Sequence, residues 1–176
     1  IFAYATEYMH GKPDLGRFYM ALLAFMGSIL GVALAADLVL LFLFWELTSV
    51  TSFVLIGYYT EDAESRYSAR MAMVITVGGG LALLVGILLV GVGAEAAGLS
   101  PFDLAAILAN SGEVADALRA DGIFLPALAL IAVAAAAKSA QVPLYFWLPG
   151  AMVAPTPVSA FLHSATMVKV GVYALG

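Results

Sequence analysis

The sequence predicts an all-α integral membrane protein. Of its 176 residues, 64% are hydrophobic and only 11% are charged, whereas a soluble domain is about 45–50% apolar and about 25% charged. The mean hydropathy of +1.04 points the same way. A single core cannot hide this much apolar surface from water, so lipid must solvate much of it. The apolar residues also fall into stretches of the roughly 20 residues that cross a bilayer as a helix.

Five such stretches are expected to be transmembrane helices. They cover residues 18–36, 38–59, 71–92, 123 to about 142, and 158 onward. Asp37 alone separates the first two, a charged connection at 60–70 separates the second from the third, and charged residues at 7–17 precede the first.

The connections also predict an orientation. If the spans alternate, four basic residues fall on one side of the membrane: Lys12, Arg17, Arg66 and Arg70. Arg119 alone falls on the other side, so the positive-inside rule places the first group in the cytoplasm. The connection at 93–122 then lies outside the cell. It contains a short amphipathic helix, for which we expect Ser100 as the N-cap and Pro101 as the first helical residue.

The fourth stretch is expected to be a broken helix. Four prolines follow it within fifteen residues: Pro143, Pro149, Pro155 and Pro157. Proline at this density interrupts a helix, and non-helical backbone at membrane depth is tolerated only where protein or a water-filled cavity surrounds it. The alternative is an ordinary cytoplasmic loop, although the apolar and aromatic residues at 142–147 argue against it.

Glu46 lies near the middle of the second stretch, where hydropathy should exclude a charge. A charge at a helix centre costs about 2.5–3.5 kcal/mol on insertion scales, so such residues usually face the bundle interior and mark ion or proton paths. Ser49 and Ser52 follow at spacings of three and extend a polar strip along one side of the helix. The alternative is a carboxyl group that only hydrogen-bonds a neighbouring helix.

Lys138 follows four alanines, residues 134–137, inside or at the end of the fourth stretch. Such small residues let another helix approach closely. A lysine and a carboxylate in these surroundings can change each other's protonation, and Glu46 is the expected partner. The alternative is a lysine at a helix end whose ammonium group reaches the membrane interface.

The last stretch carries four polar residues spaced by four, three and three: Ser159, His163, Thr166 and Lys169. On an α-helix these spacings place them along one face about 15 Å long. Histidine titrates near neutral pH, and hydroxyl groups can continue a chain of water molecules. The pattern predicts a proton path, although a lone histidine in a packed interior is more often structural.

Other functional classes find no support in the sequence. With 7 Lys and Arg against 12 Asp and Glu and no basic cluster, nucleic acid is not an expected partner. The lack of cysteine excludes disulfides and iron–sulfur clusters. No metalloprotease, dinucleotide-binding, P-loop or serine-hydrolase motif occurs, and the glycines at 78–80 indicate close helix packing. We therefore expect no cofactor and assign no metal site.

Five segments together resemble the proton-antiporter membrane family. They are residues 44–49 (FWELTS), 52–58 (SFVLIGY), 138–143 (KSAQVP), 146–149 (FWLP) and 154–169 (APTPVSAFLHSATMVK). The family contains the large A subunit of Mrp-type multisubunit sodium/proton antiporters and the antiporter-like subunits of respiratory complex I and membrane-bound hydrogenases. Within it, the FWELTS and HSATMVK forms are most similar to the Mrp A subunit.

The resemblance implies a role for each intramembrane charge. Glu46 would be the essential glutamate of the family's fifth helix, and Lys138 the lysine of its broken seventh helix. His163 and Lys169 would be the connecting residues of the eighth. The five helices would form one of the family's two inverted repeats. Because both ends resemble cut ends, we expect residues 1–176 to be a single domain truncated on both sides.

The sequence thus predicts an ion-translocating subunit of a sodium (or potassium)/proton antiporter, which is a secondary transporter and not an enzyme. Its expected partners are other membrane subunits of a hetero-oligomeric complex, protons, the monovalent cation and the lipid bilayer. The expected location is the bacterial inner membrane, with several passes. Two alternatives remain: a proton-pumping subunit of NADH:quinone oxidoreductase or a related hydrogenase, and a non-transporting structural subunit.

Overall fold

The computed structural model describes residues 2–173, apart from the side chains of residues 163–165, and consists of helices. In chain order these are α1 (Phe2–Tyr8), α2 (Leu15–Leu34), α3 (Leu38–Ile56), α4 (Ala63–Ala96), α5 (Leu104–Ala109), α6 (Ser111–Ala120), α7 (Phe124–Lys138), α8 (Trp147–Gly150), the 3₁₀ helix η1 (Ala151–Val153), α9 (Thr156–Ser159), the π-helix η2 (Ala160–Thr166) and α10 (Met167–Tyr173). Residues 2–173 contain no β-strand, only one isolated bridge between Asp37 and Asp103. The all-α class is therefore confirmed.

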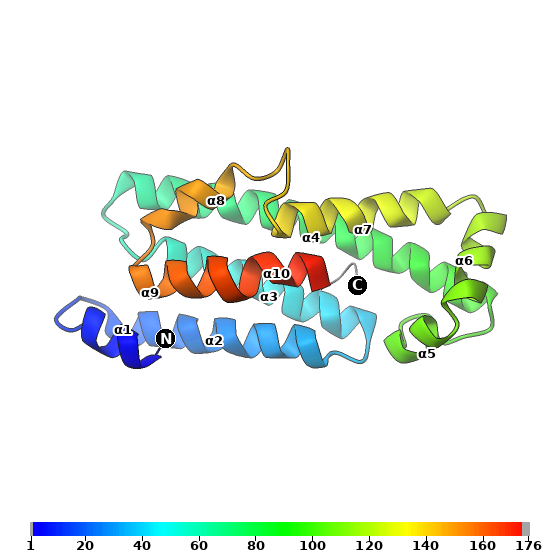
Figure 1. Cartoon of the computed structure of the whole chain (residues 1–176), viewed down its shortest axis with the longest axis horizontal. Coiled ribbons are helices and arrows are strands. Elements are labelled where there is room, and N and C mark those ends of the chain that lie inside the picture. Colours follow the sequence, from blue (N-terminus) through cyan, green and yellow to red (C-terminus); the bar gives the residue numbers. More distant parts are fainter. Residues whose placement is uncertain (1, 174–176) are drawn as a thin grey trace.

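The long helices run along the length of the molecule and reverse direction from one to the next (Figure 1). α2, α3 and α4 are followed by α7, and the run α9–η2–α10 returns along them. α5 and α6 lie together at one end of the bundle, between α4 and α7 (Figure 1). This alternation agrees with the order of spans expected from the sequence.

Two aspartates determine where α3 and α4 begin. The Asp37 carboxylate accepts hydrogen bonds from the backbone N–H groups of Val39 and Leu40, at 2.8 and 3.0 Å. The Asp62 carboxylate accepts from Ser65 N at 3.0 Å. Each cap satisfies N–H groups that have no partner inside the helix, which stabilises the end by about 0.5–2 kcal/mol. The tight connection expected at Asp37 is confirmed.

α4 begins earlier than the sequence suggested. Hydropathy placed its start at Met71, but the helix starts at Ala63 and runs for 34 residues, about 51 Å at 1.5 Å per residue. Its first turns are amphipathic, because Ser65, Ser68, Ala69 and Ala72 are buried at helical spacing. Arg66 and Arg70 point outward and are exposed. The charged residues in these turns lower their average hydropathy, so hydropathy alone does not reveal this part of the helix.

Among residues 2–173, three helices are long and apolar enough to cross a membrane: α2, α3 and α4. α6 and α7 pass the same test only as a pair bent by 117°, which would make a fourth span. Helices also occur at the fourth and fifth expected positions, but α7 has only 15 residues and the C-terminal run changes from α to π and back. The count of five spans stays a prediction.

The fourth expected helix ends at Lys138 and not near Val142. The next residues turn, with Ala140 at a φ of 52°, and regular structure resumes only in the short segments α8, η1 and α9. The interruption expected from the prolines is therefore present. Pro155 and Pro157 are buried, whereas Pro143 and Pro149 are exposed.

The connection at 93–122 contains two helices and not one. The N-cap of the first is Asp103, whose carboxylate accepts a hydrogen bond from Ala106 N at 3.0 Å, and the first helical residue is Leu104. The assignments of Ser100 as the N-cap and Pro101 as the first helical residue were therefore wrong. Aspartate is as strong an N-cap as serine, and Pro101 does not decide between them. The second helix, α6, is amphipathic and buries Val114 and Leu118. Its small and charged residues gave no apolar stretch that could indicate it.

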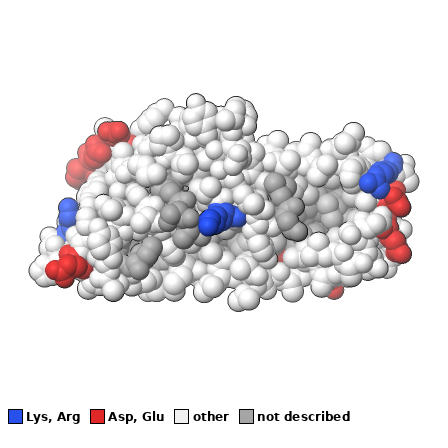
Figure 2. Space-filling model, in the orientation of Figure 1, with Lys and Arg blue, Asp and Glu red and all other residues white. Residues whose placement is uncertain are grey.

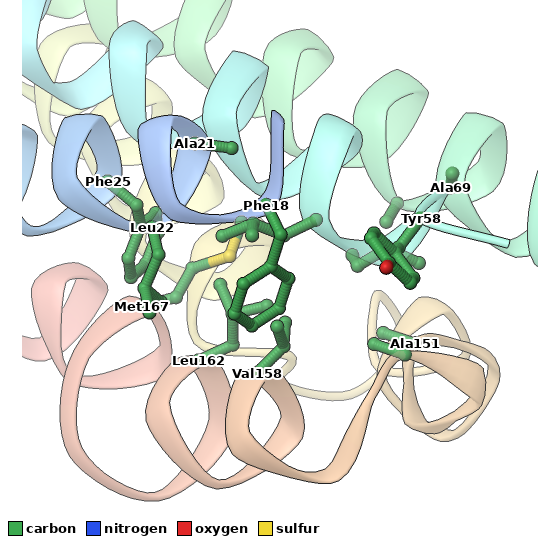
Figure 3. Close-up of a cluster of buried hydrophobic side chains, with 14 of the residues drawn as sticks. Phe18, Ala21, Leu22, Phe25, Tyr58, Ala69, Ala151, Val158, Leu162 and Met167 are labelled. Atoms are coloured by element: carbon green, nitrogen blue, oxygen red, sulfur yellow. The ribbon is translucent and has the colours of Figure 1, made fainter. Parts of the chain in front are cut away.

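α2 and the C-terminal run share a hydrophobic core (Figure 3). Phe18, Leu22 and Phe25 of α2 face Leu162 and Met167, and all five are fully or almost fully buried. A second core of Leu41, Trp45, Leu83, Ile87, Ala134 and Val170 joins α3, α4, α7 and α10. These cores fix the positions of the polar side chains between the helices.

The outer surface is suited to lipid. Large apolar side chains on the long helices are exposed, for example Leu34 at 80% and Val74 at 71%. Charged residues gather at the two ends of the molecule and leave the face between them uncharged except for one basic patch near its middle (Figure 2). An apolar band with charged ends is the pattern expected of a bundle that spans a bilayer.

Candidate functional site

Lys138 is the centre of the site. It is the last residue of α7, and its side chain is fully buried. The ammonium Nζ donates hydrogen bonds to Ser49 Oγ at 2.7 Å and to the Trp45 carbonyl oxygen at 3.0 Å. It also lies 5.2 Å from the centroid of the Trp45 ring, within cation–π distance. All these contacts come from α3, so α3 holds the ammonium inside the bundle.

The sequence of α3 explains how it does this. Trp45 and Ser49 are four residues apart and therefore share a face. The Trp45 carbonyl also accepts a bond from Thr48 Oγ1 at 2.6 Å, and Ser52 Oγ donates to the Ser49 carbonyl at 2.8 Å. Ser49 and Ser52 are buried, which confirms the expected polar strip. Thr48 was not predicted from the sequence; its position one turn after Trp45 was the available signal.

Glu46 lies beside this group without pairing with it. The two charges act on each other electrostatically, but no Glu46–Lys138 ion pair within 4.0 Å occurs among the described residues. Glu46 Oε1 is buried and accepts no hydrogen bond from the described part of the chain. The structure therefore brings the two expected partners into one region and leaves the carboxyl group separate from the ammonium.

The glycines of α4 explain how three helices come this close. A methyl group at Gly79 would lie 2.5 Å from Ala137 Cβ of α7. A methyl group at Gly80 would overlap Oε1 of Glu46 and lie 2.6 Å from its Cδ. Gly78 has open space around it. The expected close packing is confirmed for two of the three glycines, and they face different neighbours.

Trp147 supports the end of α7. Its side chain is buried, and its indole Nε1 donates a hydrogen bond to the Ala137 carbonyl at 3.0 Å. The last carbonyls of a helix lack partners inside it, so this bond satisfies one of them next to Lys138. The bond brings the segment after the break back against the helix that precedes it.

α10 packs on the same end of α7. A methyl group at Gly171 would lie 2.5 Å from the Ala135 carbonyl oxygen and 3.0 Å from Ser139 N. The helix that carries Lys169 therefore touches the end of the helix that carries Lys138. Lys169 itself is exposed. With Thr166 it lines a groove of about 160 Å³ against Ile29 and Val32 of α2.

The remaining polar residues of the C-terminal run bond locally. Ser159 Oγ donates to the Ala154 carbonyl at 3.3 Å, and Thr166 Oγ1 donates to the Phe161 carbonyl at 2.6 Å. The side chain of His163 lies outside the described residues. The expected single face assumed a regular α-helix, but residues 160–166 form a π-helix, which changes the angle between successive side chains. No described contact joins Thr166 or Lys169 to Lys138.

The described residues offer no group of three or more His, Cys, Asp or Glu side chains that could hold a metal ion. The buried polar groups around Lys138 include its own ammonium, the Glu46 carboxyl group and the hydroxyls of α3. This composition defines a class: a helical membrane protein with ionisable groups enclosed in its bundle, as occurs along ion and proton paths.

The family follows from comparison. Residues 35–176 match the family model described as NADH:quinone oxidoreductase/Mrp antiporter, TM, and the chain belongs to this family. The A/B subunit of a probable K(+)/H(+) antiporter from Rhizobium meliloti is 50% identical over 174 residues, which are 98% of this chain and 16% of that protein. The A1 subunit of a Na(+)/H(+) antiporter from Staphylococcus haemolyticus is 47% identical over 170 residues, covering 97% of this chain and 20% of that protein.

A solved structure supports the same family assignment. A chain of the Mrp complex from a Dietzia species matches with a TM-score of 0.84 at 40% identity, covering 98% of this chain and 18% of that chain. These findings confirm the similarity to Mrp A subunits that the sequence motifs indicated, and with it a multi-pass helical membrane protein. The chain spans about a fifth or less of the length of these relatives.

Proposed function

We propose that this chain is the ion-translocating part of one subunit of a multisubunit sodium (or potassium)/proton antiporter. Protons move through a half-channel formed by Glu46 and Lys138 and continued by His163 and Lys169. The observation that carries the proposal is the fully buried Lys138 ammonium, bound by α3 and adjacent to a carboxyl group with which it makes no ion pair.

The energetics favour a functional role over a structural one. Burying an ion costs several kcal/mol even after the protein relaxes, and well-packed apolar residues of similar volume are often more stabilising than a buried pair. A structural bundle would gain nothing from Lys138 in this position. Its retention is explained if the lysine changes partners or protonation during transport.

Two sets of partners are available to Lys138. In the present arrangement the ammonium binds Ser49 and the Trp45 carbonyl. Pairing with Glu46 is the other arrangement that we propose. Alternation between the two would release a proton from the lysine when its acceptors change and bind another when they are restored.

The C-terminal run would carry charge onward. α10 packs on the end of α7 next to Lys138, at Gly171, and the same run bears Ser159, His163, Thr166 and Lys169. A π-helix within it is a further supporting feature, because such segments are frequent at functional sites. The hydroxyls of Ser159 and Thr166 are the proposed supporting path beside His163 and Lys169.

The membrane arrangement is part of the proposal. Residues 1–176 belong to one antiporter domain in the bacterial inner membrane, with five spans that form one inverted repeat. Lys12, Arg17, Arg66 and Arg70 face the cytoplasm, and residues 93–122 face outward. Its partners are other membrane subunits of the complex, as the relatives' names and the Mrp complex support.

The alternative is a proton-pumping subunit of NADH:quinone oxidoreductase, because the family model covers both kinds of protein. The same residues would then move protons with energy from electron transfer. The relatives described above belong to antiporters, which favours the first function. Proton exchange driven by a sodium or potassium gradient, without any electron donor, would separate the two.

The test uses the complete complex in everted membrane vesicles. Glu46→Gln and Lys138→Ala should each abolish cation-dependent proton exchange, followed by a pH-sensitive dye, while the complex still assembles in the membrane. Thr51→Ala is a matched control on α3, because its hydroxyl bonds only to backbone carbonyls of its own helix. Normal exchange in both charge variants would exclude the proposed path.

A further inference from the structure

Gly80 is the residue of α4 that faces the Glu46 carboxyl group. A methyl group built on Gly80 would overlap Oε1 of Glu46, lie 2.6 Å from Cδ and lie 3.3 Å from Oε2. No other part of a neighbouring side chain or backbone comes among the nearest atoms of that position. The Glu46 carboxyl group thus lies in the space left by the absent side chain, here called the Gly80 notch.

The notch holds the carboxyl group away from Lys138. Glu46 Oε1 is buried and accepts no hydrogen bond from the described residues, so no hydrogen bond to that oxygen holds the group there. The Lys138 ammonium meanwhile binds Ser49 and the Trp45 carbonyl. The carboxyl group can lie this close to α4 because α4 has no side chain at Gly80.

We propose that Gly80 is a positioning residue for transport: its lack of a side chain gives the Glu46 carboxyl group a resting place on α4, apart from Lys138. This inference rests on the proposed function. It adds that the ion pair between Glu46 and Lys138 can open because the carboxyl group has somewhere else to lie. With the notch filled, the carboxyl group is displaced, and the nearby ammonium is the charge that attracts it.

The neighbouring glycines supply matched controls. Gly78→Ala adds the same methyl group to the same helix in open space. Gly79→Ala adds it against Ala137 and so tests the packing of α4 on α7 without touching Glu46. All three substitutions raise helix propensity in the same way, so only the environment of the methyl group differs among them.

The experiment measures cation-dependent proton exchange in everted vesicles containing the complete complex, normalised to the amount of assembled complex. We expect Gly80→Ala to lower the rate at least tenfold and Gly78→Ala to leave it within twofold of wild type. Equal rates for Gly80→Ala and Gly78→Ala would overturn the inference.

A shortened carboxylate provides the readout that a packing defect would not give. Glu46→Asp withdraws the carboxyl group by one methylene, away from a methyl group at position 80. In the wild-type background it should lower the rate, whereas in the Gly80→Ala background it should raise the rate. In the Gly79→Ala background it should not raise it. Failure to raise the rate of Gly80→Ala would overturn the inference.

If the Gly80→Ala complex does not assemble, a second variant still tests the inference. If the clash with Glu46 is the cause, Glu46→Ala in the same chain removes the clashing atoms and restores assembly; if assembly is not restored, the inference is wrong. Different results would refute the proposed function and the role of Gly80. An active Glu46→Gln complex refutes the path itself, whereas an inactive Glu46→Gln complex with a fully active Gly80→Ala complex refutes only the role of Gly80.

Discussion

Replacing Ser49 by alanine removes one of the two hydrogen-bond acceptors of the Lys138 ammonium. The bond from Nζ to Ser49 Oγ is 2.7 Å long and fully buried, so water cannot substitute for it without entering the bundle. A hydrogen bond to a charged group contributes about 1.5–3 kcal/mol. At about 1.4 kcal/mol per factor of ten, the population of the α3-bound lysine falls about 10- to 150-fold.

The consequence for transport follows from the two sets of partners. If Lys138 alternates between α3 and Glu46, Ser49→Ala shifts it toward Glu46 and slows the step that restores the α3-bound form. We expect the maximal rate of cation-dependent proton exchange in everted vesicles to fall by at least tenfold, with the amount of assembled complex unchanged. Ser49→Thr keeps the hydroxyl and should keep most of the activity.

Ser52→Ala is the matched control for this substitution. Ser52 is equally buried, lies one turn further along α3 and donates to the Ser49 carbonyl at 2.8 Å, but it does not bind Lys138. It should therefore stay within about threefold of wild type, because its hydroxyl bonds a backbone carbonyl of its own helix and its loss leaves both acceptors of the ammonium in place. An assembled Ser49→Ala complex as active as Ser52→Ala would refute the role given to the lysine's acceptors.

Three further substitutions test the supporting structure. Trp147→Phe removes the hydrogen bond from the indole to the end of α7. It should lower the thermal midpoint of the purified complex, at a cost of about 0.5–1.5 kcal/mol. It should also reduce transport severalfold, because Lys138 is the next residue after the carbonyl that loses this bond. Asp103→Ala removes the cap of α5 and should cost about 0.5–2 kcal/mol in thermal unfolding with transport intact; Ser100→Ala, measured alongside, should cost nothing. Tyr58→Phe removes the phenol's bond to the Pro13 carbonyl and should lower the thermal midpoint slightly, by about 1 kcal/mol, without changing the exchange rate.

Hydropathy located the helices well because the cost of placing charge in lipid is large. α2 and α3 begin and end within a few residues of their expected limits. The start of α4 was missed, since Arg66 and Arg70 lower the average hydropathy of turns whose buried side is small and apolar. α6 was missed for a similar reason. It buries only Val114 and Leu118, and no apolar stretch marks it.

The site was predictable in its residues and not in its geometry. Glu46, Ser49 and Lys138 were indicated by the polarity that each brings into an apolar stretch, and the structure places them in one region. Which acceptors the lysine binds depends on the rotation of α3 against α7. Both helices pack on α4 through residues distant in sequence, Glu46 of α3 against Gly80 and Ala137 of α7 against Gly79, so no local pattern fixes that rotation.

The backbone of the C-terminal run could not be inferred from spacing. The intervals among Ser159, Thr166 and Lys169 indicate one face only if every turn is α-helical, whereas residues 160–166 are π-helical. A π-segment arises from tertiary packing and has no reliable local sequence signal. The part that His163 takes in the path therefore remains a prediction from the sequence.

Replacing Lys138 by methionine tests whether its buried ammonium group moves protons. The complete complex carrying Lys138→Met is reconstituted in liposomes, and the internal pH is followed after a sodium or potassium gradient is applied. Methionine fills a similar volume without a charge. Ser139→Ala, which alters the next residue and leaves the lysine's bonds intact, serves as the control. We predict no cation-driven pH change for Lys138→Met and a normal one for Ser139→Ala; a normal pH change with Lys138→Met would contradict the account.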